Sequence, residues 1–102
     1  MKLEALHQEF KQRFTVAVMA SATVVSAQVV AHHPNQNKQV MHVQLSVTPP
    51  GHQPYFASNN WEVEKTAIAY LQPGSEVAVK IDTKDASIIY PNTGWATYLL
   101  GK

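Results

Sequence analysis

The stretch Gln39-Val40-Met41-His42-Val43-Gln44-Leu45-Ser46-Val47-Thr48 alternates between apolar and polar residues. A period of two indicates a β-strand with one buried face, because successive side chains of a strand point to opposite sides. The buried face is expected to hold Met41, Val43, Leu45 and Val47, and the other face His42, Gln44, Ser46 and Thr48.

A second stretch, Glu76-Val77-Ala78-Val79-Lys80-Ile81-Asp82, repeats this pattern. Its apolar face holds Val77, Val79 and Ile81, whereas Glu76, Lys80 and Asp82 are expected to point outward. Two half-buried strands need a common core, so the sequence predicts a small β-rich domain.

The composition limits the size and the partners of this domain. The 102 residues are enough for one domain with its own core. Only 15% of the residues are charged, against about a quarter in ordinary domains. The net charge of +1 gives no basic stripe for nucleic acid, and without cysteine there is no disulfide or thiolate ligand. We therefore expect a weakly charged surface that favours association with proteins and not with nucleic acid.

Residues Phe14–Ala31 carry no charge and have two competing interpretations. Their many valines and threonines favour a long buried strand. One register of alternation holds Val16, Val18, Ala20, Ala22 and Val24, and the other Val25, Ala27 and Val29, so we predict a bulge near Val24-Val25. The alternative is a targeting or membrane-anchoring segment with a cleavage site before Gln28.

Residues Lys2–Phe14 are predicted to form an amphipathic helix. Its apolar stripe recurs at three- and four-residue steps and consists of Leu3, Leu6, Phe10 and Phe14. This helix either caps an open end of the β-domain or binds a partner, including a second copy of the chain. We therefore predict a single domain over 1–102, with the helix at 1–14 and the β-domain at 15–102.

Turn residues divide the remainder of the chain into short strands. Breaks are expected at 32–38, 49–51, 59–60, 72–75, 82–85 and 91–94, where Pro, Gly, Asn and Asp gather. Short strands are expected at 54–57, 61–64, 88–90 and 95–99, and Thr66–Leu71 fits a strand or a helix equally well. The predicted fold class is mainly β, a small five- or six-stranded antiparallel barrel or sandwich (OB-like or SH3-like) with an N-terminal α-helix.

The order of strand and turn signals resembles that of a known group of small domains. The signals are Val43-x-Leu45-x-Val47, Pro50-Gly51, Pro54-Tyr55 and Leu71-x-Pro73-Gly74-x-x-Val77-x-Val79-x-Ile81-Asp82. Over about residues 22–90 this pattern is similar to that of small uncharacterised bacterial β-domains of envelope and membrane-tethered proteins. The resemblance implies a barrel-like fold and proximity to a membrane, and it brings no catalytic residues or cofactor. The cytoplasm is slightly favoured as the compartment, with the cell envelope or periplasm as the alternative.

Histidines provide one candidate site. His32, His33, His42 and His52 lie in or beside the loops that flank the Met41 strand. In a hairpin His33 and His42 come close together, and imidazole pairs bind Zn²⁺ or Cu²⁺. Exposed polar histidines or a pH sensor are the alternatives, and their spacing favours the exposed histidines.

Carboxylates do not form a convincing catalytic site. Glu62 and Glu64 share one face of a strand, but their alternation with Trp61 and Val63 is better explained by a solvated strand face. Asp82 and Asp85 are expected to form a turn, with a Ca²⁺ contact as the alternative. The sequence has no Gly-rich phosphate loop, no G-x-S-x-G and no H-E-x-x-H, so we expect no enzymatic activity and no cofactor.

Aromatic residues offer either core filling or a binding platform. The candidates are Tyr55, Phe56, Trp61, Tyr70, Tyr90, Trp95 and Tyr98. We expect Trp61 and Trp95 to be mostly buried, and the exposed member of Tyr55-Phe56 to be the best surface anchor.

The sequence thus favours a non-enzymatic interaction or scaffold domain that works through protein contacts and self-association. Its expected partner-binding residues are Tyr55, Phe56, Leu3, Leu6 and Phe10. The alternative is a small ligand-binding module, for a metal through the histidines or for an oligosaccharide or single-stranded nucleic acid through the aromatic residues.

Overall fold

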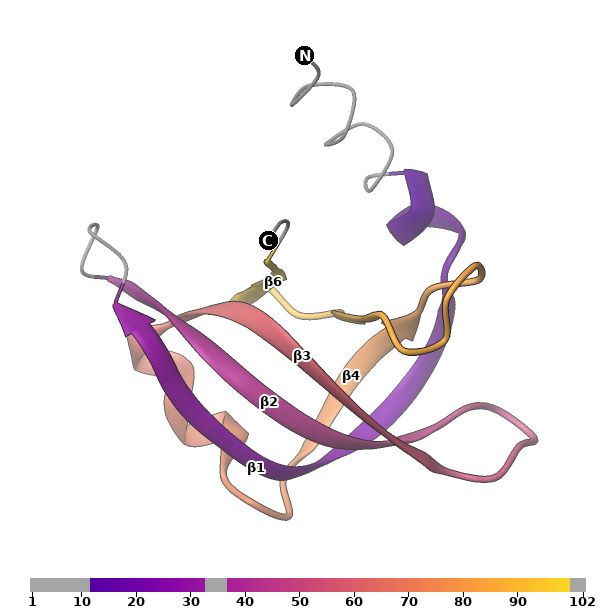
Figure 1. Cartoon of the computed structure of the whole chain (residues 1–102), viewed down its shortest axis with the longest axis horizontal. Helices are drawn as coiled ribbons and strands as arrows, with labels where there is room; N and C mark the ends of the chain where they lie inside the picture. The colour runs from indigo at the N-terminus through magenta and orange to yellow at the C-terminus, as the bar shows by residue number, and fades with distance from the viewer. Residues whose placement is uncertain (1–11, 33–36, 100–102) are drawn as a thin grey trace.

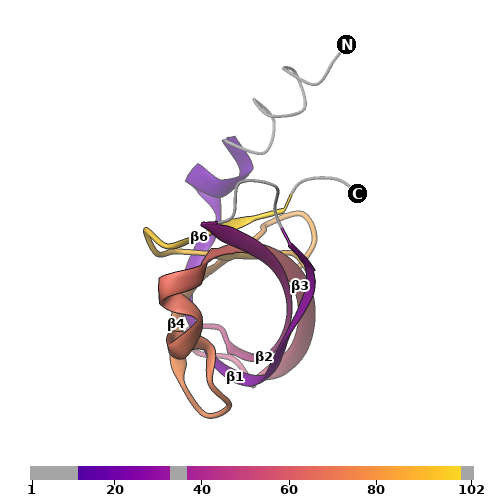
Figure 2. The same ribbon diagram turned by 90° about the vertical axis from the view of Figure 1, so that its left-hand side faces the viewer.

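The computed structural model describes residues 12–32 and 37–99, which form a small antiparallel β-barrel preceded by a turn of helix at 12–16 (Figure 1). The strands are β1 (Val18–His32), β2 (Lys38–Thr48), β3 (Tyr55–Glu64), β4 (Glu76–Ile81), β5 (Ile89–Pro91) and β6 (Ala96–Tyr98), with a 3-10 helix η1 (Lys65–Leu71) between β3 and β4. All six strands belong to one sheet in the order β5-β4-β1-β2-β3-β6. Seen along its axis, the sheet curls into a ring with η1 on one side (Figure 2). The predicted small barrel with an N-terminal helix is confirmed.

β1 is the longest strand and is shared by both halves of the sheet. It pairs with β4 from Val18 to Thr23 and with β2 from Ser21 to His32. Its pairing with β2 shifts between Val24 and Ser26, which confirms the predicted bulge, and shifts again between Val29 and Ala31. Bulges bend a strand and increase its twist, so they allow one long strand to follow the curve of the barrel.

The core contains the side chains that the alternation assigned to it. Met41, Val43, Leu45 and Val47 of β2 are buried, as are Val77, Val79 and Ile81 of β4. Trp61 of β3 is the largest fully buried side chain. Trp95 is partly buried and packs against the core, so both tryptophans are mostly buried, as predicted.

β3 is continuous where the sequence predicted a break at Asn59-Asn60. The strand runs from Tyr55 to Glu64 and pairs with β2 over this whole length. Asn59 is buried, and its amide satisfies two backbone groups of the β4–β5 connection and β5: Nδ2 donates to Ser87 O (3.1 Å), and Oδ1 accepts from Ile89 N (3.2 Å). The side chain of Asn59 thus hydrogen-bonds backbone groups across the barrel, where a neighbouring strand would otherwise do so, and it does not form a turn.

The gap between the edge strands β5 and β6 is closed by side chains. Trp61 Nε1 donates to Ile89 O at 3.0 Å, next to the two bonds of Asn59. Both residues belong to β3, which is not a sheet neighbour of β5. The barrel therefore closes through side-chain to backbone hydrogen bonds at this seam, because no backbone ladder joins its two edges.

The expectation that the Phe14–Ala31 segment forms a buried strand is only partly correct. The segment holds most of β1, but only its inward residues, such as Ala22 and Val24, belong to the core. Val25 and Val30 are the extra residues at the two register shifts, and both are exposed. Met19 lies on the outer face and is also exposed. Within residues 12–32 and 37–99, no helix has the length and apolar character required to cross a bilayer.

The connections follow the turn chemistry of the sequence. β2 ends immediately before Pro49-Pro50, and Gly51 and Gly74 adopt positive φ angles of 74° and 92°, which favour glycine. The ambiguous stretch at 66–71 forms η1. The hairpin between β1 and β2 is confirmed by their antiparallel pairing.

Candidate interaction surface

The outer side of β1, β2 and β3 forms a broad sheet surface, here called the β1–β3 face. The strand register aligns its side chains in three rows across the sheet. These rows are Thr23, Ser46 and Phe56; Ser26, Gln44 and Ser58; and Gln28, His42 and Asn60. All nine residues are exposed or half-buried, so the rows are open to a partner.

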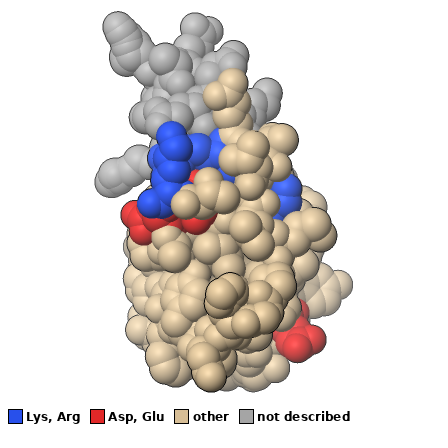
Figure 3. Space-filling view, turned by 90° about the vertical axis from the view of Figure 1, so that its right-hand side faces the viewer, with Lys and Arg blue, Asp and Glu red and all other residues tan. Residues whose placement is uncertain are grey.

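No charged side chain lies in the three rows of the β1–β3 face, whereas Lys38, Glu62 and Glu64 lie on the same outer side beyond the last row. Lys38 is the only Asp, Glu, Lys or Arg between Arg13 and Glu62 in the sequence, and it lies at the start of β2, outside the three rows. Figure 3 shows the end of the barrel near the helix, where Lys and Arg gather beside Asp and Glu while most of the rest of that view is uncharged. The low charge content of the chain therefore reflects uneven placement, with a neutral sheet face and charges at its margins.

Hydrogen bonds within the rows hold some of their side chains in place. Ser26 Oγ donates to Gln44 Oε1 at 3.0 Å. His42 Nδ1 lies 2.8 Å from Asn60 Oδ1, a distance at which the ring N–H donates to the amide oxygen. The side chains of Ser26, Gln44 and Asn60 carry further donors and acceptors, so they are suited to hydrogen bonding with a second polar surface.

Exposed apolar side chains border the same rows. Phe56 is 79% exposed and Met19 is 65% exposed, and the bulge residues Val25 and Val30 are also open to solvent. Phe56 is thus the exposed member of the predicted Tyr55-Phe56 anchor. Tyr55 is half-buried, and its hydroxyl donates to Ala86 O at 2.7 Å. The other three predicted partner-binding residues, Leu3, Leu6 and Phe10, lie outside the described residues.

A second polar cluster fastens the turn of helix to the barrel. Arg13, the only arginine of the chain, donates from Nε to Asp82 Oδ1 (3.0 Å) and from Nη2 to Asp82 Oδ2 (2.7 Å). Tyr90 donates to Oδ1 at 2.7 Å, and the backbone N–H groups of Lys84 and Asp85 donate to Oδ2. We call Arg13, Asp82 and Tyr90 the Asp82 anchor. A two-pronged Arg–carboxylate pair fixes both distance and orientation, so the anchor sets the direction in which the helix leaves the barrel.

The ionisation of the Asp82 anchor follows from these contacts. The Arg13 hydrogen bonds, helped by those from Tyr90 and Lys84 N and opposed by burial, lower the pKa of Asp82 to about 2. Burial and the hydrogen bond to Asp82 raise the pKa of Tyr90 above its ordinary value. The carboxylate and the phenol therefore keep fixed charge states, which suits a structural role better than proton transfer.

Phe14 adds an apolar contact to the anchor. Its ring meets Tyr90 edge to face at 5.7 Å, and Lys80 Nζ lies 4.3 Å from its centroid while also donating to Phe14 O at 3.2 Å. Phe14 belongs to the apolar stripe predicted for the helix, and it packs on β4 and β5. The remaining residues of that stripe lie outside the described part of the chain.

The expectation that Asp82 points to solvent is wrong. Asp82 follows the inward Ile81, as the alternation requires, but Arg13 and Tyr90 cover it and its side chain is fully buried. Asp82 and Asp85 do form the predicted turn, through the backbone bonds at residues 84 and 85. Because Arg13, Tyr90 and two backbone N–H groups already occupy both oxygens of Asp82, a Ca²⁺ contact at this carboxylate is not supported.

Of the two histidines predicted to bind a metal, only His42 lies within the described residues. His42 lies in a row of the β1–β3 face beside Asn60, and His33 lies outside the described residues. Over residues 12–32 and 37–99, no group of three His, Asp or Glu side chains is arranged to hold a metal ion. Glu62 and Glu64 are half-buried at the end of β3.

The aromatic residues do not form one platform. Trp61 lies in the core, Tyr90 lies beneath Phe14 and packs on Tyr98 at 5.3 Å, and Tyr70 pairs with Trp95 at 5.5 Å. Phe56 lies apart from these groups on the β1–β3 face. A continuous stacking surface for a single nucleic-acid strand is therefore not present among the described aromatic residues.

Comparison of the chain with protein-family models, with curated proteins and with solved structures finds no match.

Sequence reasoning did not foresee the Asp82 anchor. Arg13 and Asp82 are 69 positions apart, and no local pattern pairs them. One compositional feature pointed to Arg13. It is the single arginine of the chain, and it lies just before an uncharged segment. The neutral rows were visible as the polar half of the strand alternation, although their alignment across three strands required the register.

Proposed function

We propose that this protein is a non-enzymatic interaction domain whose β1–β3 face binds a second copy of the chain. The observation that carries the proposal is the absence of Asp, Glu, Lys and Arg from three rows of side chains across β1, β2 and β3, on a surface that also exposes Phe56 and Met19. Centres of protein interfaces are depleted of charged residues and enriched in aromatic residues and methionine, and this face has both properties.

The chemistry of the face favours self-association. In a two-fold dimer the same patch lies on both subunits, so every side chain meets a surface of its own kind. A patch of Asp, Glu, Lys or Arg would repel itself in that arrangement, whereas Ser, Thr, Gln and Asn offer donors and acceptors together. The hydrogen-bonded pairs Ser26–Gln44 and His42–Asn60 reduce the side-chain entropy that is lost on binding.

The Asp82 anchor gives this domain a scaffold role. It fixes the end of the helix on the outer side of β4 and β5, away from the β1–β3 face. The side of β4 and β5 thereby holds the turn of helix at 12–16, while the β1–β3 face remains open to a partner.

Sedimentation of the full chain over a range of concentrations tests the proposal. We expect a monomer–dimer equilibrium that Phe56→Glu shifts to monomer, because the change places two like charges in one interface. Tyr70→Glu is the matched control, since Tyr70 is 59% exposed on η1 outside the face, and we expect it to associate as the unmodified chain does. A chain that is monomeric at every concentration, or a Phe56→Glu variant that still dimerises, contradicts the proposal.

The alternative function is binding of an oligosaccharide by the same face. Neutral hydrogen-bonding rows beside the exposed Phe56 ring also suit sugar hydroxyls and the apolar side of a sugar ring. A monomeric chain whose Gln44 and Asn60 side-chain resonances shift on addition of a neutral oligosaccharide would favour this alternative over self-association.

A further inference from the structure

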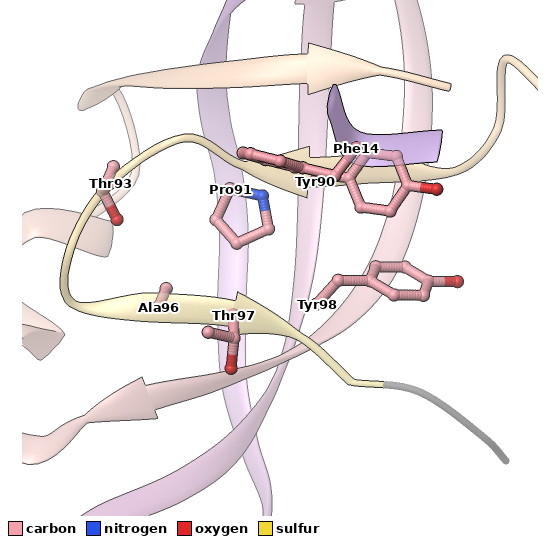
Figure 4. Close-up of a pocket in the computed structure, with 7 residues that line it drawn as sticks. All are labelled: Phe14, Tyr90, Pro91, Thr93, Ala96, Thr97 and Tyr98. Atoms are coloured by element: carbon pink, nitrogen blue, oxygen red, sulfur yellow. The ribbon is translucent and has the colours of Figure 1, made fainter. Parts of the chain in front are cut away.

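The seam between β5 and β6 contains a hollow that the proposed self-association does not use. β5 with Tyr90 and Pro91 forms one wall, and β6 with Ala96, Thr97 and Tyr98 forms the opposite wall (Figure 4). Phe14 from the helical segment lies at one end and Thr93 at the other. The hollow measures about 330 Å³.

The seam stays open at Pro91 because the hydrogen bonds that close it end two residues earlier, at Ile89. The side chains of Asn59 and Trp61 bond the backbone of residues 87 and 89, and the next inward position of β5 is Pro91, which has no N–H to offer. β6 pairs with β3 on its other side, from Ala96 to Tyr98. The two edge strands therefore separate at Pro91 and leave space between them.

The walls of the hollow are mainly apolar and contain an aromatic cluster. Phe14 meets Tyr90 edge to face, with 83° between their planes, and Tyr90 meets Tyr98 at 69°. Edge-to-face clusters present both ring faces and ring edges, which are the surfaces that another aromatic ring prefers. None of the seven residues that line the hollow is charged.

One polar group of the hollow lacks a partner. Among the described residues, Thr93 Oγ1 is the buried side-chain polar atom without a hydrogen bond. A buried hydroxyl without a partner is unfavourable, so a ligand that supplies one gains affinity from it. The Tyr90 hydroxyl is already bonded to Asp82 and points away from Thr93, so the hydroxyls that remain for a ligand include those of Thr93 and Thr97 (Figure 4).

We propose that this hollow binds a small uncharged aromatic molecule of one or two fused rings that carries a hydrogen-bonding group. An apolar cavity of about 150 Å³ holds benzene, so roughly twice that volume has room for a bicyclic ring. The ring packs between Pro91 and the Tyr90–Tyr98 pair, and its polar group bonds the Thr93 hydroxyl after rotation about the Cα–Cβ bond. A charged ligand is disfavoured because the walls supply no counter-ion.

This site is separate from the proposed dimer face. In the sheet order β5-β4-β1-β2-β3-β6, the β1–β2 pair lies in the middle and the seam joins the two ends, so they are on opposite sides of the barrel. Ligand binding and self-association are therefore expected to be independent, and failure of one leaves the other unaffected.

Titration of the full chain with indole, followed by amide and methyl resonances, tests the proposal. We expect saturable shifts at residues 92–98, with smaller or no shifts at Thr23, Ser46 and Phe56. Benzoate, which has a ring and a negative charge, is the comparison ligand and is expected to bind at least ~10-fold more weakly.

Two variants in the hollow and one control variant outside it make the result specific to the hollow. Thr97→Phe places a ring at an exposed position of its rim and is expected to abolish the indole shifts in a folded protein, whereas Thr66→Val on η1 leaves them unchanged. Thr93→Val removes the hydroxyl and is expected to weaken indole binding by a few-fold. The affinity of this variant for indole should then be about that for a ring without a polar group, such as naphthalene. Absence of saturable indole binding, shifts that centre on another surface, or full binding by folded Thr97→Phe would overturn the proposal.

Discussion

The polar side chains on the two sides of this barrel differ in burial and in hydrogen bonding. On the side of β4 and β5, Asp82 is buried and accepts hydrogen bonds from Arg13, Tyr90 and two backbone N–H groups. In the three rows of the β1–β3 face, the polar residues are Ser, Thr, Gln, Asn and His, which are more exposed and lie beside the exposed Phe56. The first arrangement specifies the fold and the attachment of the helix, whereas the second contributes little to either.

This difference indicates where selection for function has room to act. A buried charged cluster tolerates few substitutions, because loss of one member leaves the others unpaired in a dry environment. A neutral exposed face costs little stability to change, so its composition reflects what it contacts. Each of the following predictions separates these two roles.

The largest effect is expected at the seam that closes the barrel. Trp61→Ala removes a fully buried ring and the donor to Ile89 O, so we expect the free energy of unfolding to fall by about 4 kcal/mol. The matched change Tyr70→Ala removes an exposed ring and should cost about 1 kcal/mol or less. Urea unfolding of both variants measures the difference, and equal losses would show that the seam does not hold the barrel closed.

The Asp82 anchor should give the next largest effect. Asp82→Asn keeps the shape of the side chain but removes its charge, and we expect a loss of roughly 2–3 kcal/mol because Arg13 then lacks its carboxylate. Asp85→Asn is the control, since Asp85 is exposed and bonds mainly to Ser87. Chemical denaturation should give a clearly lower free energy of unfolding for Asp82→Asn than for Asp85→Asn. Equal stability of the two variants would contradict a structural role for the anchor.

The same anchor predicts a particular loss of stability in acid. A carboxyl whose pKa is lowered to about 2 in the folded state and lies near 3.9 in the unfolded chain stabilises the fold above about pH 4. This contribution, about 2 kcal/mol, should disappear as the pH falls from about 4 to 2. Thermal unfolding at several pH values measures it, and the Asp82→Asn variant should show a correspondingly flatter dependence over that interval.

The smallest effect on stability is expected on the β1–β3 face. Phe56→Ser exposes no core and should change the free energy of unfolding by no more than about 0.5 kcal/mol. The same substitution should weaken self-association by at least ~10-fold, because an exposed aromatic side chain is the best anchor on this face. A variant that loses stability and association together would place Phe56 in the fold and not in an interface.

The strands were predictable because their signals are local. The alternation in β2 and β4 and the bulge at Val24-Val25 follow from residues that are neighbours in the chain. The continuity of β3 through Asn59-Asn60 was not predictable, since the amide of Asn59 is used by backbone groups about 30 positions away. Local turn propensity gave the wrong answer there because a tertiary contact outweighed it.

The two candidate sites also differ in how much of them the sequence contains. Phe56 and the polar half of β2 were recognisable as a surface from alternation alone, although the rows needed the strand register. The Asp82 anchor joins the two ends of the described chain, so its members share no pattern of spacing. Burial of Asp82 on the outer side of a sheet has no sequence signature at all.

The most direct test of the central claim is the concentration dependence of the amide resonances of the full chain. If the β1–β3 face is where the chain binds itself, then raising the concentration should shift the amides of Thr23, Ser46 and Phe56 while those of Ala96 and Asp82 stay in place. Unchanged resonances over the whole range, or shifts confined to the seam and the Asp82 anchor, would contradict the assignment of this face as the interaction surface.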